Sequence, residues 1–161
     1  MSCIRVGIGQ DSHRFLDSEA IKPCIIGGLI FPEVPGLDAD SDGDVVFHAI
    51  CNAITSITGV AVLGDIAVKL CHQEGVTDSQ IYLEHELKTI KKQKIQHVAL
   101  AIEGKRPRLQ NRIDEMRQSI GRVMQLKTNQ VGITVTSGDG LTDFGCGDGL
   151  QCFCTLTTME C

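Results

Sequence analysis

The sequence has no long apolar segment and no excess of basic residues. No apolar run approaches the roughly 18 residues that a membrane span requires, and the N-terminus lacks the basic-then-apolar layout of a secretory signal. The net charge of -5 and pI of about 5.5 argue against a general nucleic-acid binder, because affinity for a phosphate backbone depends on clustered basic charge. We therefore expect a cytoplasmic protein with no membrane and no nucleic-acid partner.

The sequence also lacks paired cysteines, internal repeats, low-complexity segments and the glycine fingerprints of P-loop or dinucleotide-binding proteins. Its eight cysteines include no Cys-x-x-Cys pair, and most lie inside apolar runs. In a chain without an export signal, we expect them to stay reduced and to pack as small hydrophobic residues. They are Cys3, Cys24, Cys51, Cys71, Cys146, Cys152, Cys154 and Cys161.

The length and the periodicity predict one α/β (α+β) domain. A chain of 161 residues that is 42% hydrophobic fits a single domain over 1–161 with a substantial core. Apolar patterns predict strands over 4–9, 24–31, 98–102, 131–135 and 150–157, and helices over 45–57, 79–94 and 112–126. We expect the first two strands to pair. The alternation of strands and helices indicates a mixed β-sheet with helices packed on one face.

Three residues form a candidate metal site. Asp11 and His13 are two positions apart, so on an extended strand both side chains leave the same face. His48 projects from the helix expected at 45–57, with Asp42 or Asp44 as its cap. Three ligands of this kind leave one position open on a tetrahedral Zn²⁺, as in catalytic zinc sites.

Each of these residues alone also fits an ordinary role in a turn, on the surface or on a helix. Asp44 lies four residues before His48 on the same side of the helix, so it could hydrogen-bond to the imidazole.

A glycine-rich segment over 136–149 is a second candidate site. Its backbone N–H groups could approach a ligand closely, and hydroxyls at Thr136 and Ser137 could bind phosphate oxygens. Asp139 could hold a hard divalent cation. A hairpin that needs its glycines only for turns fits the composition equally well.

Seven blocks in order resemble the 2-C-methyl-D-erythritol 2,4-cyclodiphosphate synthase family. They are Gly9-Gln10-Asp11-Ser12-His13, Ile26-Gly27-Gly28, Ser41-Asp42-Gly43-Asp44 with His48, Leu63-Gly64-Asp65-Ile66, Arg106-Pro107-Arg108-Leu109, 113–117 and 145–149. The resemblance implies a homotrimer with active sites between subunits. It also implies Zn²⁺, or another divalent cation at the same site, and Mg²⁺ or Mn²⁺ at a second site.

The family reaction implied by this resemblance is a cyclisation. The 2-phosphate of 4-diphosphocytidyl-2-C-methyl-D-erythritol 2-phosphate attacks the β-phosphoryl group, which closes a cyclic diphosphate and releases CMP. Asp11, His13 and His48 would bind zinc and Asp139 the second metal. Asp40, where the family usually has histidine, and Ser137 would be the catalytic residues.

The resemblance also carries over a set of substrate contacts, in which the 103–109 segment would bind the cytosine. The set comprises Asp11, Ser12, His13, Asp40, Ser41, Asp65, Ile66, Ala67, Arg106, Pro107, Arg108, Leu109, Thr136, Ser137, Gly138 and Asp139. Residues 71–78 would form a loop shorter than the mobile loop usual in the family.

The residues by themselves leave two other functions open. One is a zinc-dependent phosphohydrolase, and the other is a nucleotide-binding module in which zinc only braces a loop.

Overall fold

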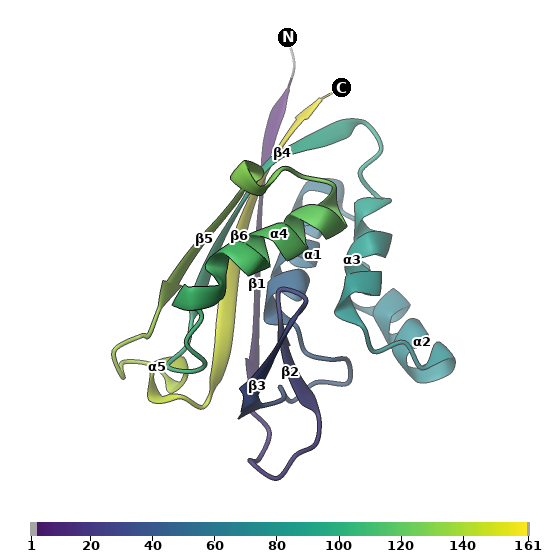
Figure 1. Ribbon diagram of the computed structural model, residues 1–161. Coiled ribbons are helices and arrows are strands. Elements are labelled where there is room, and N and C mark those ends of the chain that lie inside the picture. Colours follow the sequence, from purple (N-terminus) through teal and green to yellow (C-terminus); the bar gives the residue numbers. More distant parts are fainter. Residues whose placement is uncertain (1–2, 161) are drawn as a thin grey trace.

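The computed structural model describes residues 3–160 and contains a four-stranded mixed sheet (Figure 1). The strand order is β1 (Ile4–Arg14), β6 (Gly149–Glu160), β4 (Gln93–Glu103) and β5 (Val131–Thr136). The β4–β5 pair is parallel, and the other two pairs are antiparallel. A separate hairpin is formed by β2 (Pro23–Ile26) and β3 (Leu29–Pro35).

Helices α1 (Val45–Thr58) and α4 (Ile113–Met124) pack on one face of the sheet, and α3 (Ser79–Leu87) packs against both of them (Figure 1). The remaining helices are α2 (Asp65–Glu74) and the short α5 (Asp143–Cys146). Two 3₁₀ turns span Gln110–Arg112 and Thr128–Gln130. The predicted mixed sheet with helices on one side is therefore confirmed. No helix in residues 3–160 is long and apolar enough to cross a membrane.

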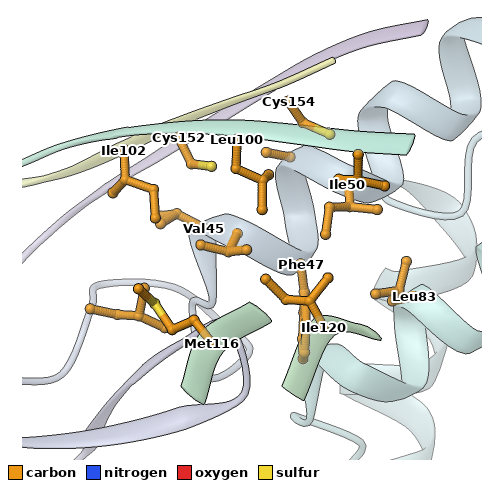
Figure 2. Close-up of a cluster of buried hydrophobic side chains, with 14 of the residues drawn as sticks. Val45, Phe47, Ile50, Leu83, Leu100, Ile102, Met116, Ile120, Cys152 and Cys154 are labelled. Atoms are coloured by element: carbon orange, nitrogen blue, oxygen red, sulfur yellow. The ribbon is translucent and has the colours of Figure 1, made fainter. Parts of the chain in front are cut away.

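The core lies between the sheet and helices α1, α3 and α4. Figure 2 shows its side chains converging from all of these elements. The labelled residues are Val45, Phe47, Ile50, Leu83, Leu100, Ile102, Met116, Ile120, Cys152 and Cys154. Because α1 is wedged between the sheet and α3, nearly all of its first ten residues are buried. The helix that carries His48 is thus the most extensively buried helix within residues 3–160.

The other face of the sheet is exposed and partly apolar in the single subunit. Along β1, Ile4, Val6 and Ile8 are 67%, 64% and 66% exposed, while Gly7 and Gly9 on either side of Ile8 are buried. On the neighbouring β6, Phe153 is 46% exposed. This alternation is that of a strand with one covered and one open face.

The prediction for residues 24–31 was wrong in two respects. Instead of one strand, the segment forms both arms of a hairpin, because Gly27 and Gly28 adopt positive φ values of 60° and 76° and turn the chain. The first long strand pairs with β6 along its whole length and not with this segment. A glycine pair inside an apolar run was the signal for the turn.

The helix predicted over 79–94 ends at Leu87. Thr89 folds back, and both its backbone N–H and its hydroxyl donate to the carbonyl of Glu86 at 2.9 and 2.7 Å. Lys94 therefore belongs to β4. Residues 65–74, where neither helix nor strand was expected, form α2, so the loop predicted at 71–78 is in part helical. Helix α2 buries none of its residues and lies away from the sheet (Figure 1).

The cysteines within residues 3–160 are all free thiols, as predicted, and those at positions 24, 51, 152 and 154 are buried. Cys161 lies outside the described residues. The predicted helices at 45–57 and 112–126 and the strands at 98–102, 131–135 and 150–157 are each confirmed, with ends shifted by a few residues.

Candidate metal centre

Asp11, His13 and His48 converge, although His48 is 35 residues or more distant from the other two in the chain. One ligand atom from each residue can be chosen so that all lie within 4.8 Å of one another. Oδ2 of Asp11 is 3.0 Å from Nε2 of His13 and 3.1 Å from Nδ1 of His48. A single carboxylate oxygen thus faces one nitrogen from each of the two imidazoles.

The donor set fits a divalent cation. Nε2 of His13 is buried and has no hydrogen-bond partner among residues 3–160, although Oδ2 of Asp11 lies close by, because the contact lacks hydrogen-bond geometry. A buried imidazole nitrogen without a partner is costly, and coordination of a metal would satisfy it. Two imidazoles and one carboxylate match the ligands found in catalytic zinc sites, which leave one position open.

Two glycines of β1 allow this convergence. A Cβ at Gly9 would lie 2.1 Å from the carbonyl oxygen of Ala49, and one at Gly7 would lie 2.2 Å from that of Ala53. Only glycine therefore lets β1 approach α1 so closely. Asn52, one turn after His48, donates from Nδ2 to the carbonyl of Gln10 at 2.9 Å and fixes the two elements at this distance.

Contacts among the three side chains shift the pKa values of Asp11 and His13. Burial would raise the pKa of Asp11, but the close polar contacts and the charge of the His13 and His48 imidazoles outweigh it, so this pKa lies below its usual value. Burial likewise would lower the pKa of His13, but the neighbouring Asp11 carboxylate raises it by more. In the absence of a metal, the cluster therefore favours an ionised carboxylate beside a proton-holding imidazole.

Asp44 does not contact the imidazole of His48, so the hydrogen bond proposed from the helix spacing is wrong. Its carboxylate accepts from Val46 and Phe47 at the start of α1 and from Gly27 and Gly28 in the hairpin turn, at 2.7–3.2 Å. Asp44 is thus the cap of α1 and ties the hairpin to it. Its complete burial, together with the charge of Asp42, raises its pKa to about 6.

The second nitrogen of His48 contacts Ser79, which the sequence did not single out as a site residue, and Ser41, which is among the expected substrate contacts. Nε2 lies 2.8 Å from Oγ of Ser79 and 3.4 Å from Oγ of Ser41. Ser79 is fully buried at the start of α3, where Asp78 caps the helix by accepting from Gln80. The Asp78-Ser79 pair carried a helix-start signal, but no local pattern indicated that the hydroxyl would reach His48.

A cavity of about 210 Å³ opens beside the three candidate ligands. It is lined by His13 and His48, by residues 39–41 and by α2 with the turn before it. Asp40, Ser41 and Ala67 thus share this cavity with the metal centre, whereas Asp65 and Ile66 do not line it. A larger cavity of about 640 Å³ shares residues 39–41 and extends toward the hairpin.

The remaining predicted residue on β1, Ser12, lies apart from this cavity. It borders a smaller hollow of about 180 Å³ that α5 and the start of β6 complete.

The other candidate residues lie at the opposite edge of the sheet. Thr136, Ser137, Gly138 and Asp139 follow β5, which is one edge strand, whereas Asp11 and His13 lie on β1, which is the other. Two strands separate these edges, so about 14 Å of sheet lies between them. Within one subunit, the structure does not bring Asp139 to the three metal-ligand candidates.

The 136–139 segment and the 106–109 segment both lie near the end of β4. Ser137 donates to Oδ1 of Asp139 at 3.0 Å, and a Cβ at Gly138 would meet Glu103. Arg106 donates to the carbonyl of Gly147 at 3.0 Å, and Arg108 is exposed. Pro107, which lies between these two arginines, and Leu109, which follows them, are buried.

Comparison with known proteins gives the family of this chain. The model of the YgbB family matches residues 4–159. This chain belongs to the YgbB family. Among curated relatives, the 2-C-methyl-D-erythritol 2,4-cyclodiphosphate synthase of Chlamydia felis is 58% identical over 157 residues, which are 97% of this chain and 89% of the relative. That of Chlamydia caviae is 56% identical over the same shares of the two chains.

Solved structures show the same YgbB fold. A 2C-methyl-D-erythritol-2,4-cyclodiphosphate synthase in its CDP-bound form aligns over 94% of this chain and 98% of its own, with a TM-score of 0.76 and 27% identity. The CDP complex of IspF from Plasmodium falciparum aligns over 98% and 96%, with a TM-score of 0.83 and 22% identity. The bifunctional IspDF from Campylobacter jejuni gives a TM-score of 0.89 at 20% identity and covers 100% of this chain and 43% of its own.

Proposed function

We propose that this chain catalyses the cyclisation of 4-diphosphocytidyl-2-C-methyl-D-erythritol 2-phosphate. An oxygen of the 2-phosphate forms a bond to the β-phosphorus, the bond between that phosphorus and the oxygen of the α-phosphate breaks, and CMP leaves with that oxygen. The product is 2-C-methyl-D-erythritol 2,4-cyclodiphosphate. The observation that carries the proposal is the convergence of Asp11, His13 and His48 beside a cavity, in a chain that is 58% identical to a synthase of this name.

Asp11, His13 and His48 would hold Zn²⁺ or another divalent cation. When bound, this cation supplies positive charge that offsets the repulsion between two approaching phosphates. The buried nitrogen of His13 and the carboxylate of Asp11 already face one another, so the ligands need little rearrangement to bind it. Asp139 would hold Mg²⁺ or Mn²⁺ together with the substrate diphosphate.

The protein would act mainly by positioning. Ring closure requires the two ends of a flexible substrate to meet, and fixing such an orientation is worth roughly 7 to 11 kcal/mol in favourable systems. Asp40 and Ser41 line the cavity beside the candidate ligands and would orient the 2-phosphate end. Thr136, Ser137 and Gly138 would hold the diphosphate, and 106–109 would hold the cytosine.

The active form would be a homotrimer with its sites between subunits. The metal-ligand candidates and the 136–139 segment lie at opposite edges of one sheet, so a complete site needs the second segment from a neighbouring copy. The exposed apolar face of β1 and β6 supplies a surface on which copies can associate. We extend this proposal to the whole chain, 1–161, as one synthase domain that acts in the cytoplasm.

Product analysis tests the proposal. Incubation with the cytidyl substrate and Mg²⁺ should yield equal amounts of CMP and the cyclic diphosphate. ³¹P NMR can identify and quantify both products. An open-chain phosphate in place of the ring would identify a zinc-dependent hydrolase instead. A chelator should abolish turnover while leaving the far-ultraviolet circular dichroism unchanged. A protein that shows no turnover even with its metal, and that unfolds when the metal is removed, would instead be a module that zinc merely braces.

A further inference from the structure

The imidazole of His48 is engaged on both of its nitrogens. Nδ1 faces Asp11 and the candidate metal position, and Nε2 lies 2.8 Å from Oγ of Ser79. The hydroxyl of Ser79 in turn contacts Oδ1 of Asp42. A continuous chain of hydrogen-bonding groups thus runs from the metal centre through His48 and Ser79 to Asp42.

The chemistry of the groups sets the direction of every hydrogen bond in this chain. An ionised Asp42 can only accept, so the single hydroxyl proton of Ser79 goes to it. Oγ of Ser79 is then left as an acceptor, and Nε2 of His48 must be the nitrogen that carries the proton. With this proton on Nε2, Nδ1 is the nitrogen that can give its lone pair to a cation bound beside Asp11.

Asp42 is itself held rigidly from two elements. Its Oδ1 accepts from the backbone N–H of Asp44 at 3.0 Å, and its Oδ2 accepts from the backbone N–H of Ser79 at 3.0 Å. The N–H of Asp42 donates to the carbonyl of Thr77 at 2.8 Å. The loop before α1 and the first turn of α3 are thus joined directly behind the imidazole.

We propose that Ser79 and Asp42 are positioning residues for His48, holding it in the tautomer that presents Nδ1 to the metal. Such partners on the far nitrogen of a metal-binding histidine fix the ring and typically change metal affinity 10- to 100-fold when removed. Asp44 cannot take this role because its carboxylate caps α1 and binds the hairpin turn. This inference rests on the metal centre of the proposed function.

Zinc affinity measured by competition with a chromogenic chelator tests the proposal in the intact protein. Ser79→Ala should weaken zinc binding by about 10-fold or more, and Ser79→Thr, which keeps the hydroxyl, should restore most of it. Ser119→Ala is a matched control, because Ser119 is also a buried serine, at 4% exposure, and its hydroxyl has no partner among residues 3–160. Its affinity should equal that of the unaltered chain.

The tautomer provides a readout that needs no variant. In the zinc-loaded protein, ¹⁵N NMR of labelled histidine should show His48 bound through Nδ1 and protonated at Nε2, and Ser79→Ala should shift the Nε2 resonance because the hydrogen bond to Ser79 is lost. His48 bound to zinc through Nε2 in the unaltered chain, or equal zinc affinity of folded Ser79→Ala and the unaltered protein, would overturn the positioning role. Failure of the unaltered chain to bind zinc at all would instead overturn the metal centre itself.

Discussion

Oδ2 of Asp11 lies 3.1 Å from Nδ1 of His48, although the residues are 37 positions apart in the chain. This contact joins the sheet to its central helix at the candidate metal centre. His48→Ala should therefore abolish stoichiometric zinc while leaving α1 formed, because the alanine fits a helix and only the ligand is lost. Metal analysis after dialysis would give the zinc content, and circular dichroism the helix content.

A second histidine on a helix serves as the control for this variant. His85 belongs to α3 and is not part of the group that could hold a metal. His85→Ala should keep one zinc per subunit. Full zinc content in His48→Ala would rule out His48 as a ligand.

The close approach of β1 to α1 makes Gly9 a second critical position. A Cβ there would lie 2.1 Å from the carbonyl of Ala49 and 2.3 Å from the N–H nitrogen of Ala53, both of them backbone atoms that cannot move alone. Gly9→Ala should therefore lower the free energy of unfolding by about 1–3 kcal/mol or more and displace Asp11 from His48. Urea unfolding measures the first effect and zinc affinity the second.

Gly59 provides a comparison for Gly9. It ends α1 with a φ of 74°, and apart from its own neighbours in the chain no residue within 3–160 comes within 4 Å of the position that a Cβ would occupy. Gly59→Asn, which tolerates that backbone, should cost little and leave zinc affinity unchanged. Equal losses in the two variants would mean that the approach of β1 to α1 does not depend on Gly9.

The metal-ligand candidates could be predicted from the sequence because each follows from a local rule. Two residues at positions 11 and 13 share one side of a strand, and α1 has a clear apolar period with a cap at its start. The contact of Ser79 with His48 could not be predicted in this way. It depends on how α3 docks against α1, and the first residue of a helix carries no signal of its tertiary partner.

The errors in the fold have equally physical origins. The run at 24–31 is apolar throughout, so its period does not distinguish one strand from a hairpin, and only the positive φ of Gly27 and Gly28 decides. Helix α2 was missed because it buries none of its residues, so its apolar side chains do not form a stripe that faces the core. The lysines after Leu87 extend a polar pattern beyond the point where Thr89 ends α3.

The exposed face of the sheet predicts self-association. Ile8 is 66% exposed on β1, next to other apolar side chains, whereas Ile21 is fully exposed in a loop away from that face. Ile8→Glu places a charge where neighbouring copies would pack and should convert trimers to smaller species. Ile21→Glu should leave the trimer intact. Light scattering after size-exclusion chromatography would distinguish these outcomes, and trimers from both variants would exclude this face as the interface.

Glu86 is a buried carboxylate that the core would tolerate better without its charge. It is 0% exposed, and its oxygens accept from Oγ1 of Thr55 at 3.1 Å and from the N–H of Val62 at 3.0 Å. Burial raises its pKa above the ordinary value of 4.5 by more than these two hydrogen bonds lower it. Between 4.5 and the raised pKa, the folded chain holds more protons than the unfolded chain, so stability falls as the pH rises through this window.

Glu86→Gln should therefore increase the free energy of unfolding at pH 7, by an amount on the order of 1 kcal/mol. The glutamine oxygen can still accept from Val62, and its amide can donate to Thr55, whose hydroxyl then turns to the carbonyl of Val60 at 3.3 Å. The gain should shrink as the pH falls toward 4.5, where the glutamate itself becomes neutral. Urea unfolding at several pH values, with the exposed Glu84→Gln as control, measures this trend. A loss of stability that is the same at every pH would show that the charge of Glu86 is fully compensated in the fold.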